Sequence, residues 1–277
     1  MPELPEVETI KRQLNRKIKG KRIKKVEVRL KKLVRHSLKK FKKIVEGAKI
    51  IKVSRRAKLL IIEISGGYCL VIHLKLTGQL IYQRTGNNEQ GAGKHTHIIY
   101  TFTDGSQLLH NDLRQFGYVK VVPKKELADF LTKERFGPEP LEKSFILNLF
   151  RQLLTKKPRA KIKPLLMDQT FIAGLGNIYS DEVLFFAGVL PFRRASSLKP
   201  EEIKKIYQSI RKILPQAVKR QGTSVDMYLT AEGKEGGYAS LLKVYDRCDE
   251  PCFACRTKIK RLKLGGRSAH FCTKCQK

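Results

Sequence analysis

The first residues of the chain place an amine beside carboxylates. Pro2 follows Met1, with Glu3 and Glu6 close behind, so removal of Met1 would expose a secondary amine next to two acids. The pKa of an N-terminal amine is about 7.7–8.0, which leaves roughly a tenth of it neutral and nucleophilic at pH 7. The same residues suit an ordinary helix start, because proline is tolerated there and acids complement the helix dipole. These residues alone leave both interpretations open.

Four cysteines near the C-terminus have the spacing of metal ligands. Cys252-x2-Cys255 is followed by Cys272-x2-Cys275, and four thiolates in two such pairs are typical of a tetrahedral structural zinc site. Two disulfides would need an oxidising compartment, for which the sequence carries no targeting segment. We therefore predict one structural Zn²⁺ ion. Basic residues between the pairs, Arg267 among them, suggest a finger that grips phosphate.

The charge of the chain indicates a polyanionic partner. Among 277 residues there are 58 Lys and Arg against 25 Asp and Glu, a formal net charge of +33 at pH 7. Nucleic acid is favoured over a membrane surface because tryptophan is absent and no basic stretch has the aromatic apolar face of an interfacial helix. A general lysine enrichment in a heat-adapted organism is the alternative. The apolar runs are strand-sized and no signal-peptide core is present, so we expect a cytoplasmic protein, near the nucleoid if bacterial, with no membrane contact.

The hydrophobic pattern changes along the chain from helix to strands and then back to helices. Val7, Ile10, Leu14 and Ile18 recur at helical spacing before Gly20. Alternating and β-branched runs then predict antiparallel strands, and a helical pattern with a break at Pro215 follows. The predicted strands include 26–30, 59–64, 69–74, 97–102 and 117–122, and the predicted helices are 124–132, 143–154, 161–169, 179–188 and 200–220.

Strands followed by helices, without regular βαβ alternation, predict an α+β protein. The turn-rich segment 136–140 is the natural connector between the two patterns. We expect an N-terminal catalytic domain at 1–135, a helical domain at 136–240 and a zinc finger at 241–277.

Several motifs, taken together, carry a resemblance over essentially the whole chain. They are Pro2-Glu3-Leu4-Pro5-Glu6, Arg55-Arg56-Ala57-Lys58, Asp112-x-Arg114-x-Phe116-Gly117, Gly137-Pro138-Glu139-Pro140, Gly174-Leu175-Gly176-Asn177-Ile178-Tyr179, and Arg267 ahead of Cys272-x2-Cys275. This combination resembles the formamidopyrimidine-DNA glycosylase family, also called 8-oxoguanine DNA glycosylase/AP lyase. The resemblance implies an N-terminal helix with an antiparallel β-sandwich, a helical domain with a helix-two-turn-helix, and a four-cysteine zinc finger.

The resemblance also implies an activity and its residues. The family excises oxidised purines such as 8-oxoguanine and formamidopyrimidines: Pro2 would attack C1′ of the damaged nucleotide, expel the base and form a Schiff base, and β- and δ-elimination would then cut the strand. Glu3 matches the carboxylate that moves protons at the sugar, and Glu6 is a possible second one. Lys58 matches the lysine of β-elimination, and Arg267 the finger arginine of phosphate binding and δ-elimination.

Extruding a nucleotide from the stack leaves a gap that the protein must fill. Leu76, Arg114 and Phe116 match the family's gap-filling residues. The resemblance implies a monomer acting on double-stranded DNA with an oxidised base or abasic site, and it implies a lesion-capping loop at 221–238. The implied DNA contacts are His95, Arg114, Arg159, Lys163, Asn177 and Tyr245.

Four residues depart from the family pattern. Leu76 stands where the family commonly has methionine, and Thr96 replaces an aspartate between two histidines. Asp246 and Arg256 stand where the family usually has glycine. These departures affect details of DNA binding, and none removes a catalytic group.

Two alternatives remain. An endonuclease VIII-like glycosylase for oxidised pyrimidines typically has glycine in place of Leu4 and other gap-filling residues, so Leu4, Arg114 and Phe116 favour the purine enzyme. A non-catalytic zinc-containing DNA-binding protein would share the charge and the cysteines but would need no free Pro2 amine.

Overall fold

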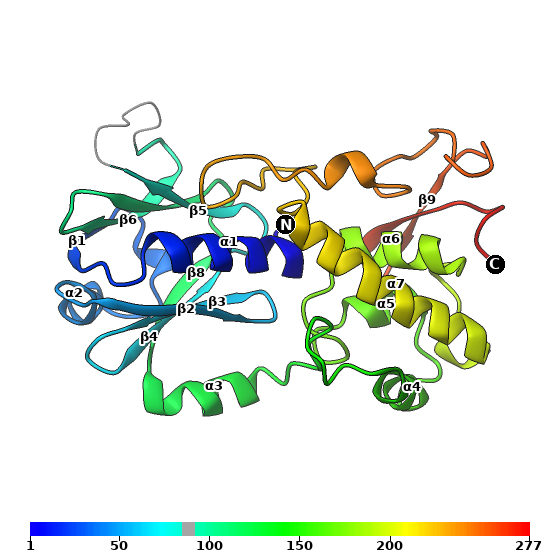
Figure 1. Ribbon diagram of the computed structural model, residues 1–277, viewed down its shortest axis with the longest axis horizontal. Coiled ribbons are helices and arrows are strands. Elements are labelled where there is room, and N and C mark those ends of the chain that lie inside the picture. The colour runs from blue at the N-terminus through cyan, green and yellow to red at the C-terminus, as the bar shows by residue number, and fades with distance from the viewer. Residues whose placement is uncertain (85–91) are drawn as a thin grey trace. The chain divides into compact units, whose positions relative to one another are not determined.

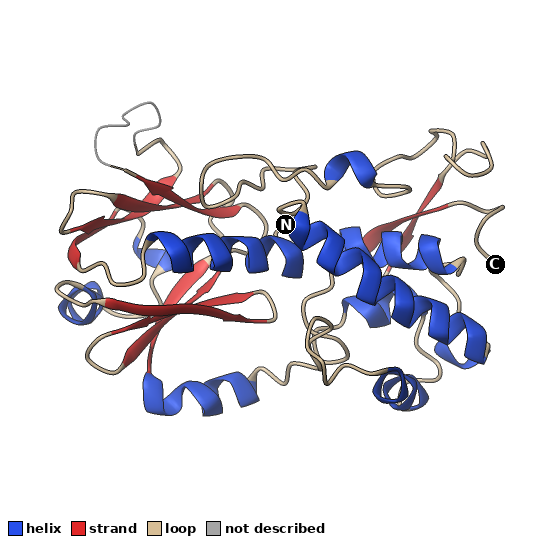
Figure 2. Cartoon of the chain, in the orientation of Figure 1, coloured by secondary structure: helices blue, strands red, loops and turns tan. Residues whose placement is uncertain are grey.

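A computed structural model describes residues 1–84 and 92–277 of the chain. It divides into two compact units, which are Met1–Glu134 with Arg220–Ala239, and Arg135–Lys219 with Ser240–Lys277. Strands dominate the first unit and helices the second (Figure 2). The prediction of an α+β protein is confirmed. Segment 220–239, which the sequence pattern assigns to the helical domain, belongs instead to the first unit.

The first unit contains a β-sandwich of two four-stranded antiparallel sheets, ordered β1-β6-β7-β5 and β2-β3-β4-β8. Alternating apolar residues of both sheets and of α1 form its main core. The strands are β1 (Ile23–Val28), β2 (Ile50–Arg56), β3 (Leu59–Ile64), β4 (Tyr68–His73), β5 (Gly78–Gln83), β6 (Thr96–Phe102), β7 (Gln107–Asp112) and β8 (Tyr118–Pro123). Two short helices complete this unit, α2 (Leu38–Val45) and α3 (Leu127–Lys133).

Helix α1 (Leu4–Lys17) packs along the edge strands β2 and β5 (Figure 1). Its apolar stripe, including Val7, Ile10 and Leu14, is fully buried, as the helical spacing predicts. The chain leaves the helix through Gly20, whose φ of 85° is accessible to glycine without strain. The packed stripe anchors the start of the chain.

Two connections cross between the sheets at the same end of the sandwich. Strands β4 and β8 pair with His73 opposite Tyr118, and strands β5 and β7 pair with Gly78 opposite Asp112. The β4–β5 and β7–β8 connections therefore start and finish on neighbouring strands. The turn of the β2–β3 hairpin lies at this end too, because Leu59 pairs with His73.

The second unit contains four helices and a hairpin among its described elements. They are α4 (Leu147–Thr155), α5 (Ile162–Met167), α6 (Asn177–Ala187), α7 (Pro200–Lys219), β9 (Lys260–Leu264) and β10 (Arg267–Phe271). The predicted break at Pro215 was wrong, because α7 continues through that residue. No helix within residues 1–84 and 92–277 has the length and apolar character needed to cross a membrane.

Candidate active site and cysteine cluster

The start of α1 is a capped helix whose carboxylates hold it in place. Glu3 and Glu6 form a reciprocal capping box, in which the Glu3 N–H donates to Glu6 Oε2 at 2.8 Å. Glu6 Oε1 accepts a second hydrogen bond, 2.8 Å from the Thr223 N–H. A Cβ on Gly222 would lie 2.9 Å from Glu6, so only glycine fits there. The helix start is therefore confirmed, and Pro2 is buried beside this cap. The nucleophilic role of Pro2 stays a prediction.

Lys58 lies in the tight turn between β2 and β3 and is only 7% exposed, unlike most lysines of this chain. A buried ion pair ties its hairpin to α1, with 2.7 Å between Arg55 Nε and Glu8 Oε2 and both side chains 6% exposed. Burial raises the pKa of Glu8, but the Lys11 hydrogen bond and the Arg55 charge outweigh it and keep this pKa below its ordinary value. Glu8 therefore stays ionised at neutral pH, and its ion pair with Arg55 is maintained.

The predicted gap-filling residues lie on the two crossing connections. Leu76 is half-buried on the β4–β5 connection, whereas Arg114 and Phe116 are exposed on the β7–β8 connection. The Arg114 guanidinium lies 4.9 Å from the centre of the Phe116 ring, which is 52% exposed. His95, half-buried just before β6, accepts a backbone hydrogen bond from Asp112 at 3.0 Å. An exposed aromatic beside a guanidinium is well suited to stacking on a nucleic-acid base.

The pairing registers bring the predicted groups of the first unit to one end of it. Gly20, just beyond the C-terminal end of α1, bonds to Ile50 at the start of β2, whereas Glu8 near its N-terminal end bonds to Arg55 at the end of β2. The start of α1 therefore points toward the end of the sandwich that carries the Lys58 turn and both crossing connections.

In the second unit, α5 and α6 flank two consecutive turns, as a helix-two-turn-helix requires. Gln169 organises these turns, because its amide accepts from Gly174 N at 2.8 Å and donates to the Leu175 carbonyl at 2.7 Å. Asn177 is the first residue of α6, and its Oδ1 is buried with no hydrogen-bond partner in the described parts of the chain. Arg159 is exposed between α4 and α5.

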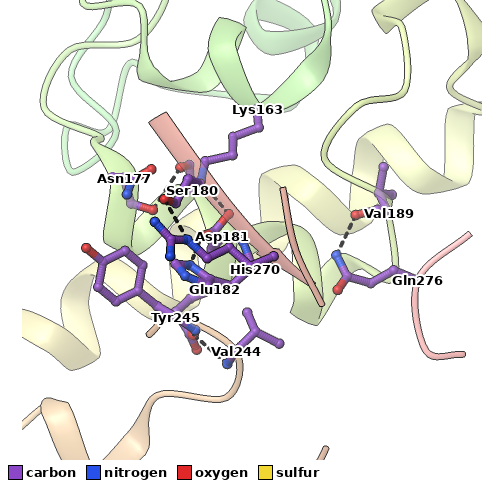
Figure 3. A network of polar contacts seen from close by, with 12 residues as sticks. Lys163, Asn177, Ser180, Asp181, Glu182, Val189, Val244, Tyr245, His270 and Gln276 are labelled. Carbon is purple, nitrogen blue, oxygen red and sulfur yellow. Dashed lines mark hydrogen bonds and ion pairs between the residues drawn. The ribbon is translucent and has the colours of Figure 1, made fainter. Parts of the chain in front are cut away.

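Lys163 corrects one sequence prediction. We expected it to contact DNA, but its side chain is 0% exposed and its Nζ lies 2.7 Å from Asp181 Oδ1. Asp181 Oδ2 in turn accepts from the His270 backbone N–H at 3.0 Å (Figure 3). The Lys163 ammonium is therefore held in a buried ion pair with Asp181 and is not accessible to a DNA phosphate. Its contacts join α5 and α6 to β10.

The four cysteines converge as their spacing predicts. Their sulfur atoms all lie within 4.8 Å of one another, with 3.9 Å between the Sγ atoms of Cys252 and Cys275 and 3.3 Å between those of Cys255 and Cys272. In a tetrahedral site with Zn–S bonds of about 2.3 Å, the sulfur atoms are about 3.8 Å apart. The cluster therefore fits a zinc ion.

Arg267 and Tyr245 also belong to the second unit. Arg267 is exposed at the start of β10, paired with Leu264 across the glycine turn of the hairpin. Tyr245 is held through its backbone N–H, which donates to Glu182 Oε1 at 3.0 Å, and its ring packs edge-on against His270. Burial raises the pKa of Glu182, although three backbone N–H groups oppose that effect.

Comparison with known proteins accounts for all parts of the chain. Residues 1–119 match the formamidopyrimidine-DNA glycosylase N-terminal domain, residues 136–228 match the H2TH domain of the same enzymes, and residues 249–277 match the zinc finger found in FPG and IleRS. A formamidopyrimidine-DNA glycosylase from Pelotomaculum thermopropionicum is 44% identical over 100% of this chain and 99% of its own length. The chain belongs to the formamidopyrimidine-DNA glycosylase family. A relative from Streptococcus mutans is 39% identical, with 100% of both chains covered.

Solved structures of the family agree with the fold. A Lactococcus lactis FPG mutant, in complex with a Fapy-dG containing DNA, has a TM-score of 0.92 and 36% identity, with 100% of both chains covered. The Lactococcus lactis Fpg in complex with an abasic site containing DNA also has a TM-score of 0.92, with 99% of both chains covered.

The structure shows the backbone cost of two departures from the family pattern. Asp246 and Arg256, where the glycosylase family usually has glycine, have φ values of 59° and 64°. The chain keeps the left-handed conformation that favours glycine, which aspartate tolerates and arginine adopts at a cost of about 1 kcal/mol. Thr96 donates a hydrogen bond to Asn111 Oδ1 at 2.7 Å and so acts within the sheet.

The sequence by itself assigns no role to several polar residues that the fold buries wholly or in part and that hold the candidate site residues of each unit. They are Asp112, which belongs to the motif of Arg114 and Phe116, and Thr77, Gln169, Asp181 and Glu182, which belong to no predicted set of site residues. Of these residues, only Asp112 could have been found from the sequence, because it lies in the same motif as Arg114 and Phe116. The others have no sequence feature that distinguishes them from ordinary surface residues, since the partners of most of them lie far away in the chain.

The ion pair of Lys163 leads to a stability prediction. Asp181→Asn should lower the free energy of unfolding by about 3–5 kcal/mol, because it leaves a buried ammonium without its counter-charge. Denaturant unfolding followed by circular dichroism measures this loss. The double variant Lys163→Met with Asp181→Leu should recover much of it.

Glu250→Gln serves as the control, because it removes a carboxylate that is 55% exposed in its pair with Arg247. Such exposed pairs contribute about 0–1 kcal/mol. Equal losses for Asp181→Asn and Glu250→Gln would contradict the structural role of the Lys163 pair.

Proposed function

We propose that this protein excises oxidised purines, such as 8-oxoguanine and formamidopyrimidines, from double-stranded DNA and cuts the strand at the resulting abasic site. It is thus a bifunctional DNA glycosylase and AP lyase of base-excision repair. The observation that carries the proposal is the convergence of the α1 start, the Lys58 turn and the two crossing connections at one end of the first unit. The relatives' name and the DNA lesions in their solved complexes support it.

The chemistry we propose begins at Pro2 after removal of Met1. Its secondary amine attacks C1′, the bond from C1′ to the damaged base breaks, and the sugar opens to an iminium that withdraws electrons. Glu3 moves protons at the sugar, and Lys58 promotes β-elimination of the 3′ phosphate. Because both Glu6 carboxylate oxygens accept backbone N–H groups, we propose that Glu6 positions the helix start.

Binding involves both units in this proposal. Leu76, Arg114 and Phe116 fill the space left by the extruded nucleotide, and His95 lies on the same unit. Arg159 and Asn177 contact phosphates from the helical part of the second unit, and Tyr245 does so from the C-terminal segment 241–277. Arg267, in the finger of the same segment, binds the lesion phosphates and assists δ-elimination. Cys252, Cys255, Cys272 and Cys275 hold one structural Zn²⁺ ion. We further propose that the protein acts as a monomer in the cytoplasm, close to the chromosome.

Strand cutting on defined lesions tests the proposal. The purified protein should cut a duplex with 8-oxoguanine opposite cytosine at least about 10-fold faster than a duplex with thymine glycol, the range that one pocket's contacts commonly provide. An undamaged duplex of the same sequence is the control. Faster cutting at thymine glycol would show that the protein is a glycosylase for oxidised pyrimidines. Cutting of neither lesion would support the alternative of a non-catalytic DNA-binding protein.

A further inference from the structure

The two connections that carry the gap-filling residues are joined by a buried carboxylate. We name residues 74–77, between β4 and β5, the Leu76 loop, and residues 113–117, between β7 and β8, the Arg114 loop. Asp112, at the end of β7, is 0% exposed and faces both loops. Its Oδ1 accepts a 2.6 Å hydrogen bond from the Thr77 hydroxyl, and its Oδ2 accepts a 2.7 Å bond from the Gly117 N–H.

Thr77 completes the link between the loops. Its hydroxyl oxygen also accepts a 2.9 Å hydrogen bond from the backbone N–H of Arg114. One hydroxyl therefore donates to the carboxylate and accepts from the residue that carries the guanidinium. Leu76 directly precedes this threonine in the chain. The relative position of the two loops thus depends on a short chain of hydrogen bonds from Arg114 through Thr77 to Asp112.

Close packing leaves this arrangement little freedom. A Cβ on Gly117 would lie 3.0 Å from Asp112 Oδ2 and 3.0 Å from the His73 carbonyl oxygen. The Asp112 backbone is held as well, because its N–H donates to the His95 carbonyl and its own carbonyl is 2.9 Å from His97 Nε2. Burial lowers the pKa of neighbouring His110 to about 4, so this histidine is neutral at pH 7 and offers Asp112 no competing positive charge.

We infer that Thr77 and Asp112 are positioning residues, which hold Leu76, Arg114 and Phe116 as one rigid unit for insertion into the duplex. The inference rests on the proposed function. Filling the gap stabilises the extruded nucleotide, so the inference concerns the step before chemistry. Groups held in advance in the productive arrangement lose less conformational entropy when they bind. If the Thr77 and Asp112 hydrogen bonds were lost, the Leu76 loop and the Arg114 loop would each have to be ordered when the protein binds a lesion, at a cost in conformational entropy.

The test compares duplex and single-stranded substrates for the isosteric variant Thr77→Val. On an 8-oxoguanine duplex, we expect kcat/KM to fall by about 10- to 100-fold, the usual effect of losing hydrogen bonds to a charged group. On a single-stranded abasic oligonucleotide, where no base pair is opened and no gap is filled, borohydride trapping should equal that of the unmodified protein. Thr77→Ser keeps the hydroxyl and should restore most of the duplex activity.

A double-variant cycle addresses the coupling of the loops. Phe116→Ala should cost less activity in the Thr77→Val background than in the unmodified protein, because the wedge is already misplaced there. Thr132→Val is the matched control, since the Thr132 hydroxyl donates to the Ala128 carbonyl within α3, away from both loops. It should leave duplex activity unchanged, and thermal unfolding verifies that each variant is folded.

The outcomes separate the two proposals. Absence of trapping by the unmodified, Met1-free protein on the abasic strand would overturn the proposed function. Normal trapping together with full duplex activity in Thr77→Val would overturn this inference alone. Equal loss of trapping on duplex and single strand in a folded Thr77→Val would also overturn it, because the hydroxyl would then serve the chemistry itself.

Discussion

Borohydride should trap the Met1-free protein on an 8-oxoguanine duplex as a covalent adduct, whereas the protein that keeps Met1 should give no adduct. Reduction by borohydride converts the iminium formed by the Pro2 amine into a stable amine. With Met1 in place, the Pro2 nitrogen is an amide whose lone pair is delocalised into the carbonyl group. Mass spectrometry of the intact protein distinguishes the two forms, and gel electrophoresis of labelled DNA quantifies the adduct.

Pro2→Gly, with Met1 removed, should reduce the rate of adduct formation by about 10²-fold or more. Glycine supplies a primary amine that rotates freely about its N–Cα and Cα–C bonds, whereas the proline ring restrains its nitrogen and presents a secondary amine. A misplacement of about 1 Å can cost that much in rate. Pro200→Gly is the control, because Pro200 is the exposed first residue of α7 and has no proposed role. An undiminished adduct in Pro2→Gly would show that another amine is the nucleophile.

Removal of zinc should unfold the C-terminal hairpin and weaken DNA binding. Structural zinc contributes on the order of 10 kcal/mol to such modules, which exceeds what a hairpin of two five-residue strands can contribute. We expect one zinc ion per chain by elemental analysis. After chelation, limited proteolysis should cleave within residues 241–277, and affinity for lesion DNA should fall as the Arg267 turn loses its support.

Cys272→Ser should reproduce the effect of chelation, because it removes a buried ligand of the cluster. Cys248→Ser is the matched control, since Cys248 is exposed and outside the cluster. A protein that binds DNA and resists proteolysis equally well after complete chelation would contradict the structural role of the metal.

Patterns that depend on neighbouring residues were predictable from the sequence. The α1 helix follows from apolar residues three and four apart, and β3 spans the same residues, 59–64, in the prediction and in the structure. Helix α2 and strands β2, β5 and β7 were not individually predicted, because their patterns are short and interrupted by lysine or polar residues. Pro215 misled the prediction, because proline lowers the intrinsic preference for helix and packing can override that preference: the buried residues Ile213, Leu214, Ala217 and Val218 surround it on α7.

The sequence by itself determined the helix that carries Pro2, the cysteine spacing, the order of strands and helices, and the family to which the motifs belong. These properties rest on local periodicity and fixed spacings. Only the tertiary structure decided which polar residues are buried. Lys163 and Asp181 pair inside the second unit, and Asp112 joins the Leu76 and Arg114 loops. A charged side chain is buried only where a partner from a distant part of the chain compensates its desolvation, and that condition is met only once the chain is folded.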